Sequence, residues 1–377
     1  MDLIKEFPLD PAICYLNHAA VGPWPARTRD CVIDFANNNT NYGARDYPKW
    51  LEVESGLREQ ARKLINANSV DDIALVKNTS EALSMVAHGV SWNKGDNVVI
   101  PMAEFPSNRV VWESLSEYGV EVRQVDTRNT NEPEIALLES IDRHTRLLSV
   151  SSVQYDIGLR LDLAQLGAAC RQQEVLFCVD AIQSLGVVSL DVETIKADFV
   201  MADGHKWLLG PEGLAIFYSR PTARNKLKLN EFGWHMLENL YEFDSSSWEI
   251  AKSARRFECG SPNMLGIHAL SASLSLFSEY SMESVTRNIF RNTSYIIEKI
   301  GNIKGIQVQT PQQASRHAGI VNFRLNDKNP TKVYESLMNQ GVICALRGGG
   351  IRFSPHFYTS TTTLDRALNI LSTELKT

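Results

Sequence analysis

Short apolar runs alternate with helical patterns between residues 73 and 218, and this alternation constrains the fold more than any other feature of the sequence. The intervening segments carry apolar residues at helical spacing, as in 161–170, so each would cover one face of a sheet. Strands that alternate with helices predict an α/β fold with a mostly parallel sheet. The seven runs that have the character of buried strands are 73–76, 97–100, 121–125, 147–153, 175–179, 199–201 and 215–218.

The pattern changes after about residue 260. A long helical stretch at 264–300 is followed by short strand candidates and two further helices, which predicts a smaller α+β domain. We therefore expect an N-terminal segment (1–20) that contributes to the active site, a large domain (21–260) and a small C-terminal domain (261–377). The later candidates are strands at 306–308, 320–323 and 351–353 and helices at 330–339 and 363–371.

Charge and cysteine usage exclude several classes of protein. The 377 residues include 44 acidic and 38 basic side chains, a net charge of −6 that would repel nucleic acid. No apolar run approaches the roughly 20 residues of a membrane helix, and residues 1–7 lack the features of a signal peptide. The six cysteines lie far apart, without a metal-ligand spacing. We expect a cytoplasmic protein with no membrane partner, disulfide or metal.

Two loops at the carboxyl ends of predicted strands carry charge or hydroxyl groups, and ligands of open parallel sheets bind at that edge. Asn78 and Glu81 fit a capping box, and the helix start with Thr79 and Ser80 would bind a phosphate. An ordinary helix cap is the alternative. Asp180 follows another strand, where a buried carboxylate needs a cation such as a protonated ring nitrogen. The alternative is again a helix cap.

Two further loops carry basic side chains. Lys206 follows a short strand within an apolar sequence, and burial would lower its pKa and make the amine nucleophilic. A lysine whose ammonium group reaches the surface is the alternative. Arg347 and Arg352 flank three glycines, and their guanidinium groups match a carboxylate. A solvated pair of arginines is the alternative there.

Taken together and in this order, these segments resemble the class V aminotransferase family of pyridoxal-phosphate enzymes, which has the fold type I architecture. The resemblance extends from residues 15–20 to residues 352–358. Its most specific part is Asp180, Gln183 and the pair His205-Lys206. It implies a large domain with a mostly parallel seven-stranded sheet, a smaller α+β domain and a homodimer with shared active sites.

The resemblance also implies roles for individual residues. Lys206 would be the catalytic Schiff-base lysine, Asp180 would pair with the pyridine nitrogen of pyridoxal 5'-phosphate, and Gln183 would bind its phenolic oxygen. Arg352 would bind the substrate α-carboxylate, with Arg347 close by. The residues implied to bind the cofactor phosphate are Thr79, Ser80, His205 and, from the neighbouring subunit, Ser261.

Three departures from the family pattern bear on the reaction. Phe105 stands where the cysteine desulfurases of this family have a stacked histidine, and phenylalanine can stack but cannot move a proton. Residues 348–350 are glycines where those enzymes carry a nucleophilic cysteine, and Cys344 lies in an apolar run typical of a buried thiol. Gln154-Tyr155 replaces an asparagine found in many relatives, so substrate recognition is expected to differ.

We therefore predict an enzyme that acts on an L-amino acid through Lys206, as an aminotransferase or as a β-eliminating lyase of the cysteine or selenocysteine type. His18 and Tyr155 are candidate substrate contacts. An epimerase of the isopenicillin N epimerase type is one alternative. A catalytically silent regulatory protein that binds pyridoxal phosphate is the other.

Overall fold

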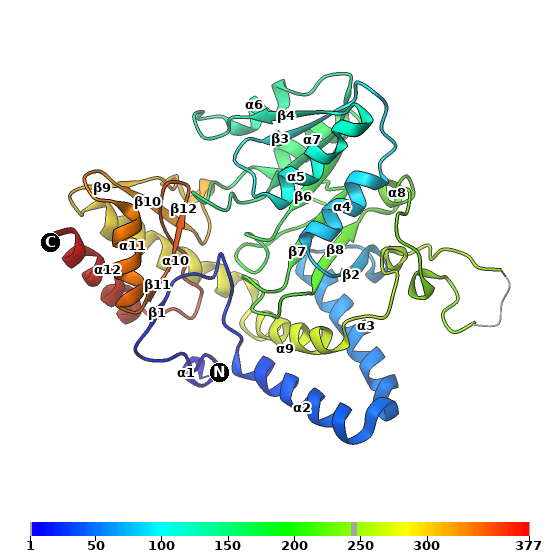
Figure 1. Cartoon of the computed structure of the whole chain (residues 1–377), viewed down its shortest axis with the longest axis horizontal. Helices are drawn as coiled ribbons and strands as arrows, with labels where there is room; N and C mark the ends of the chain where they lie inside the picture. Colours follow the sequence, from blue (N-terminus) through cyan, green and yellow to red (C-terminus); the bar gives the residue numbers. More distant parts are fainter. Residues whose placement is uncertain (1, 243–246, 377) are drawn as a thin grey trace.

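The computed structural model describes residues 2–242 and 247–376 and has a seven-stranded sheet at its centre, with strand order β2-β8-β7-β6-β5-β3-β4 (Figure 1). β8 runs antiparallel to β2 and β7, while the other neighbours are parallel. The predicted mostly parallel sheet is confirmed. Its strands are β2 (Ile73–Val76), β3 (Asn97–Pro101), β4 (Glu121–Val125), β5 (Thr145–Ser151), β6 (Leu176–Asp180), β7 (Phe199–Asp203) and β8 (Ala215–Ser219).

Both faces of this sheet are buried, because successive side chains of a strand point to opposite sides. In β3, Val98 and Ile100 join one apolar cluster and Val99 joins the other. The first cluster includes side chains of α4 (Thr79–Gly89) and α5 (Ser107–Glu113). The second cluster includes side chains from the helices α3 (Tyr47–Leu64), α6 (Pro133–Glu139), α7 (Leu163–Gln172) and α9 (Met264–Tyr280).

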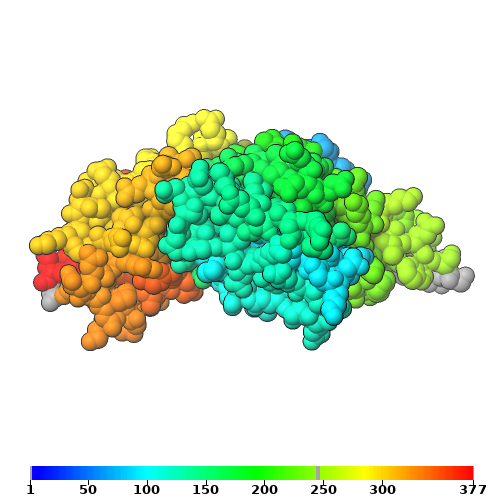
Figure 2. Space-filling view, turned by 90° about the horizontal axis from the view of Figure 1, so that it is seen from above, coloured from blue at the N-terminus to red at the C-terminus, as the bar shows by residue number. Residues whose placement is uncertain are grey.

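The C-terminal part of the chain forms one end of the elongated molecule (Figure 2) and has an apolar core separate from the two clusters of the central sheet. Four antiparallel strands in the order β12-β13-β10-β9 pack against helices there. The predicted α+β unit is therefore present. It comprises β9 (Ile306–Val308), β10 (Val321–Leu325), β12 (Ala345–Arg347), β13 (Gly350–Phe353), α11 (Pro330–Asn339), α12 (Thr361–Lys376) and part of α10 (Met282–Gly301).

The helical stretch predicted at 264–300 is two helices, because Ser281 takes a left-handed φ of 58° between α9 and α10. α9 packs against α2 (Ala26–Tyr42) and α3, below the central sheet in Figure 1. Along α10, Val285 and Ile289 belong to the cluster that also contains side chains of α3 and α9, whereas Ile296 and Ile300 belong to the core of the α+β unit. The change from one core to the other thus falls within α10, and the predicted domain boundary at residue 261 stays a prediction.

The N-terminal segment joins the two units. Its strand β1 (Cys14–Tyr15) pairs in parallel with β11 (Val342–Ile343), and both strands are too short to be predicted from alternation. Seven residues after the end of β1, the Gly22 N–H donates to the carbonyl of His205 over 2.7 Å. In the described parts of the chain, no helix has the length and apolar character needed to cross a membrane.

A substitution at Gly22 tests the close approach of its backbone to that of His205 and Lys206. A Cβ atom at this position would overlap the carbonyl oxygen of Lys206. We expect Gly22→Ala to lower the free energy of unfolding by about 1–3 kcal/mol, because the overlap forces the backbone apart. Urea denaturation measures this change.

Gly56→Ala is the matched control. Gly56 lies within α3, and a Cβ atom there meets nothing within 4 Å. We expect this substitution to raise the free energy of unfolding by about 0.5–1 kcal/mol, because alanine loses less conformational entropy in a helix. Equal effects at the two positions would contradict the proposed overlap.

Candidate active site

Lys206 lies just beyond the carboxyl end of β7 and follows His205, whose carbonyl accepts the hydrogen bond from Gly22. The side chain is buried, and its Nζ atom lies 5.5 Å from the centre of the Phe105 ring. Burial lowers the pKa of Lys206 to about 8, against the opposing effect of Asp180 and with a further lowering by Arg352. The alternative of a surface lysine is excluded, and a substantial neutral fraction of the amine exists near neutral pH.

Asp180 ends β6 and is buried beside this lysine. Burial raises the pKa of Asp180 to about 6, although the carboxylate accepts a hydrogen bond from the Ile182 N–H over 3.0 Å. No ion pair of Asp180 is present within the described chain. A buried carboxylate of this kind is stabilised by a cationic ligand group, as a protonated pyridine nitrogen would provide.

Gln183 is held firmly by protein groups. Its Nε2 donates to the Ala19 carbonyl over 2.9 Å, and its Oε1 accepts from the Trp207 indole over 2.8 Å. The second Nε2 hydrogen is left over for a ligand oxygen. The predicted bond to the phenolic oxygen of the cofactor therefore stays a prediction that this geometry permits.

Polar atoms without partners gather near the start of α4. Oγ1 of Thr79, Nδ1 of His205 and Oδ1 of Asp203 are buried and have no hydrogen-bond partner within residues 2–242 and 247–376. Burial lowers the pKa of His205 to about 4, so its ring is neutral at pH 7. The exposed Ser80 donates to Ser107 over 2.8 Å. The hydroxyl of Thr79 and a ring N–H of His205 can donate to a phosphate at this helix N-terminus, whereas Oδ1 of Asp203 only accepts hydrogen bonds.

Arg352 comes from β13 of the second core and is only 1% exposed. It donates to the Tyr155 carbonyl over 2.5 Å and to Oδ1 of Asn17 over 3.4 Å, while its Nε atom is buried without a partner. Burial, with a smaller effect of Arg347, lowers the pKa of Arg352 to about 9. The guanidinium group forms no ion pair in the described structure, so a bound carboxylate would complete its coordination.

Phe105, Tyr155 and Arg347 are the other predicted residues near Lys206 and Arg352. Phe105 and Tyr155 form an edge-to-face pair with ring centres 5.2 Å apart, and Phe105 remains 39% exposed. Arg347 is exposed and donates to the Leu346 carbonyl over 2.8 Å. Substrate contacts of Tyr155 and Arg347 are permitted by these positions and stay predictions.

The structure does not favour the predicted substrate contact of His18. The ring is fully buried, with Nδ1 2.9 Å from the Ser354 carbonyl and Nε2 2.6 Å from the Tyr358 hydroxyl. Both ring nitrogens are thus occupied by protein groups. His18 instead ties the N-terminal segment to the loop after β13, and burial lowers its pKa to about 4.

Ser261 lies on an exposed loop. It shares a cavity with Lys77, Glu81 and Gly213, whereas Thr79 and His205 do not line that cavity. The predicted contribution of Ser261 to the phosphate site of a neighbouring subunit stays a prediction.

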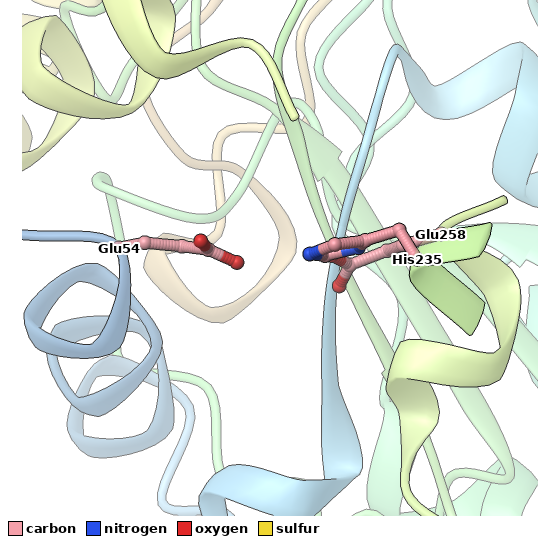
Figure 3. A group of neighbouring side chains, drawn as sticks. All are labelled: Glu54, His235 and Glu258. Atoms are coloured by element: carbon pink, nitrogen blue, oxygen red, sulfur yellow. The ribbon is translucent and has the colours of Figure 1, made fainter. Parts of the chain in front are cut away.

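A buried group of charged side chains lies beside the Ser261 loop. Glu54 points toward His235 and Glu258 (Figure 3), and the three form a group with the spacing of metal ligands. Arg58 already supplies a cation there, since it contacts Glu258 over 2.5 Å and Glu54 over 2.6 Å. Glu258 also accepts from the Leu75 N–H over 2.8 Å, so the group anchors the loop to β2.

Glu104 was not among the predicted site residues, and Gln154 was predicted only as a departure from the family pattern. Glu104 is 5% exposed, follows β3 directly before Phe105 and accepts a hydrogen bond from Nε2 of Gln154 over 3.0 Å. A glutamate at a predicted strand end was the only signal in the sequence. The partner lies 50 residues away, so only the packing of β3 beside β5 reveals the pair.

Comparison with known proteins agrees with this geometry. The family model for aminotransferase class-V matches residues 15–362. A probable cysteine desulfurase of Methanothermobacter thermautotrophicus is 29% identical over 96% of this chain and 94% of its own. One from Pyrococcus abyssi is 25% identical over 100% and 97%. The chain belongs to the aminotransferase class-V family.

Solved structures share the whole fold. Cysteine desulfurase from Thermococcus onnurineus NA1 superimposes with a TM-score of 0.88 at 21% identity, over 100% of this chain and 98% of its own. A variant of C-DES with glycine covalently linked to its pyridoxal-phosphate cofactor gives a TM-score of 0.91 at 20% identity, over 98% of both chains. The predicted fold type I architecture is confirmed.

The protein is an enzyme dependent on pyridoxal phosphate, the cofactor of its family. The observed site fits this cofactor, since it has a buried amine in Lys206, an unpaired carboxylate in Asp180 and unsatisfied groups in Thr79 and His205. These residues would hold its aldehyde, its ring nitrogen and its phosphate, respectively.

The electrostatics predict how capture of the cofactor depends on pH. Only the neutral amine of Lys206 attacks an aldehyde. The rate at which the cofactor becomes linked to Lys206, measured by trapping with borohydride, should therefore rise with pH and reach half its maximum at about pH 8. Asp180→Asn removes a charge that raises the pKa of Lys206 and should lower the midpoint. Arg352→Gln removes a charge that lowers this pKa and should raise it.

Arg287→Gln, on the exposed surface of α10, is the control and should leave the midpoint unchanged. Shifts of the same sign for Asp180→Asn and Arg352→Gln would contradict the assignment of these charges to the surroundings of Lys206.

Proposed function

We propose that the protein is a β-eliminating lyase for L-cysteine or a similar L-amino acid with a sulfur leaving group. The observation that carries the proposal is the hairpin between β12 and β13. Arg347 pairs with Gly350, and the two connecting residues Gly348 and Gly349 have left-handed φ values of 57° and 75°. A two-residue turn with these angles is a tight hairpin, and it carries no thiol to receive sulfur.

The nearest thiol along the chain is unsuited to replace it. Cys344 is only 1% exposed, and burial raises its pKa to about 12. A thiol with these properties is a poor nucleophile at neutral pH. Sulfur would therefore leave the enzyme as a free product rather than as a persulfide on this chain.

The residues of the site supply the other elements of an elimination. Bound pyridoxal phosphate supplies an electron sink for a carbanion at the substrate Cα. Arg352 holds the α-carboxylate, and Lys206 removes the Cα proton as a neutral amine. The Cα proton and the C–S bond are lost, with the bonding electrons going to sulfur. L-cysteine and water then yield pyruvate, ammonia and hydrogen sulfide.

Similar proteins support a sulfur-containing amino acid as substrate. Two curated relatives are described as probable cysteine desulfurases. C-DES, which shares the fold, is described as a cystine C–S lyase whose reaction product is cysteine persulfide. The pattern of this chain, with a glycine turn and no loop thiol, is the one expected for release of the sulfur product.

The alternative functions are less well supported. An epimerase needs an acid on the face of the substrate opposite Lys206, and two of the predicted site residues cannot supply it. Phe105 has no transferable proton, and both ring nitrogens of His18 are bonded to protein groups. A silent regulatory protein would gain nothing from an unpaired buried Arg352, because such burial is costly. A transaminase uses the same residues and is distinguished by its products.

Product analysis with L-cysteine tests the lyase. We expect pyruvate and hydrogen sulfide in equal amounts, no alanine, and loss of both products by at least a thousandfold in Lys206→Ala, because the base is gone. Cys344→Ala is the matched control and should keep the wild-type rate within about twofold. Alanine together with persulfide on Cys344 would instead establish a desulfurase.

We also propose a homodimer in which Ser261 of one subunit completes the phosphate site of the other. The exposure of Ser261 supports this arrangement, because a second copy can reach its side chain. The exposed loop carrying Ser261 is anchored by the Arg58 and Glu258 ion pair, so it could be presented rigidly to a second copy.

Mixed dimers test the sharing of sites. Lys206→Ala and Ser261→Ala homodimers should each be impaired, whereas their hybrid contains one site with both native residues. A refolded equimolar mixture should regain about a quarter of the wild-type sites, since half of random dimers are hybrids. Activity and cofactor absorbance measure the recovery, and no recovery above the two homodimers would reject shared sites.

A further inference from the structure

Glu104 is a buried acid to which the reaction proposed above assigns no role. Its carboxylate accepts hydrogen bonds from the Ser151 N–H over 2.7 Å, from the Ser151 hydroxyl, and from Nε2 of Gln154 over 3.0 Å. Within the described chain it has no basic ion-pair partner. It directly precedes Phe105 in the chain, and the centre of the Phe105 ring lies 5.5 Å from Nζ of Lys206.

Gln154 completes this arrangement and is itself 1% exposed. Its Nε2 is bonded to Glu104, whereas its carbonyl Oε1 is buried without a hydrogen-bond partner among the described residues. The next residue, Tyr155, provides the carbonyl that binds Arg352. Gln154, with its unpartnered Oε1, is thus the neighbour in sequence of Tyr155, which holds Arg352.

The protonation state of Glu104 dictates which end of the amide faces it. An ionised carboxylate only accepts hydrogen bonds, so the amide must turn Nε2 toward it and leave Oε1 unpaired. A protonated carboxyl group also donates, and it can bind Oε1 after the amide rotates by about 180° about its last torsion. Nε2 is then the end left for a ligand.

We propose that Glu104 is a positioning residue that sets the hydrogen-bonding character of Gln154 toward the bound substrate. With Glu104 ionised, Gln154 offers an acceptor; with Glu104 protonated, it offers a donor. A substrate carboxylate accepts hydrogen bonds only, so binding of an anionic amino acid favours the protonated form. The proposal rests on the proposed function only for the substrate class.

The surroundings allow this proton to be exchanged near neutral pH. Burial raises the pKa of Glu104 to about 7, the hydrogen bonds from Ser151 oppose the change, and the charge of Asp180 adds to it. Asp180 on β6 in turn faces Lys206. From the other neighbours, Asn108 of α5 is uncharged, and burial keeps the thiol of Cys178 on β6 neutral by raising its pKa.

Calorimetry of the holoenzyme tests the coupling with 3-mercaptopropionate, which carries a carboxylate and a thiol but no amine to react with the cofactor. Titrations at pH 8 in buffers of different ionisation enthalpy count the protons taken up. We expect uptake of close to one proton and an affinity that falls about tenfold per pH unit above pH 7, because the ligand selects the protonated form.

Glu104→Gln should remove both effects, since a glutamine side chain donates and accepts at every pH. Gln154→Met should bind the probe about tenfold more weakly and without the proton uptake assigned to Glu104, because its side chain has no amide. Glu134→Gln, a buried glutamate of α6 paired with Arg316, is the matched control and should behave like wild type. Wild-type proton uptake in a folded Glu104→Gln or Gln154→Met protein would overturn the proposal.

The wild-type protein alone provides an independent outcome. Absence of proton uptake at pH 8 would overturn the role of Glu104 even if the variants failed to fold. Failure of the proposed function has a different signature, because a protein that makes no pyruvate from L-cysteine can still show proton-coupled binding of the probe.

Discussion

The loss of water around Lys206, Asp180 and Arg352 is the constraint on which the rest of the structure depends. Each side chain is at least nine-tenths buried, and neither Asp180 nor Arg352 has an ion-pair partner in the described chain. Burying unpaired charge costs several kcal/mol per group in proteins. Such a site persists only within well-packed cores, and its ligands supply the missing partners. The same burial lowers the pKa of Lys206 to about 8, which increases the fraction of the amine in its reactive neutral form.

The three groups meet because two cores share one site. Asp180 and Lys206 follow neighbouring strands of the large sheet, whereas Arg352 belongs to the small sheet. Asn17 and Tyr155 hold Arg352 from the N-terminal segment and the large domain, and Gly22 binds the backbone at His205. The N-terminal part of the chain therefore links the two units. Buried His18 contributes to this link through its contacts with Ser354 and Tyr358.

The wall of the site differs chemically from that expected of a persulfide-forming enzyme. Phe105 provides an apolar ring, and the glycine turn after Arg347 provides no thiol. The buried acid and amide beside it are Glu104 and Gln154, which are joined by a hydrogen bond. An apolar ring and a turn without a thiol are consistent with elimination and release of sulfur from the enzyme.

The sequence alone determined the central sheet and the loops bearing Thr79, Asp180 and Lys206, because alternation and strand ends are local patterns. It also revealed the missing thiol. Only the tertiary structure decided that Ser281 divides two helices, that His18 is fully engaged and that Glu104 contacts Gln154. These outcomes depend on how distant elements pack, which sets burial and the choice of hydrogen-bond partner. Local periodicity does not encode that packing.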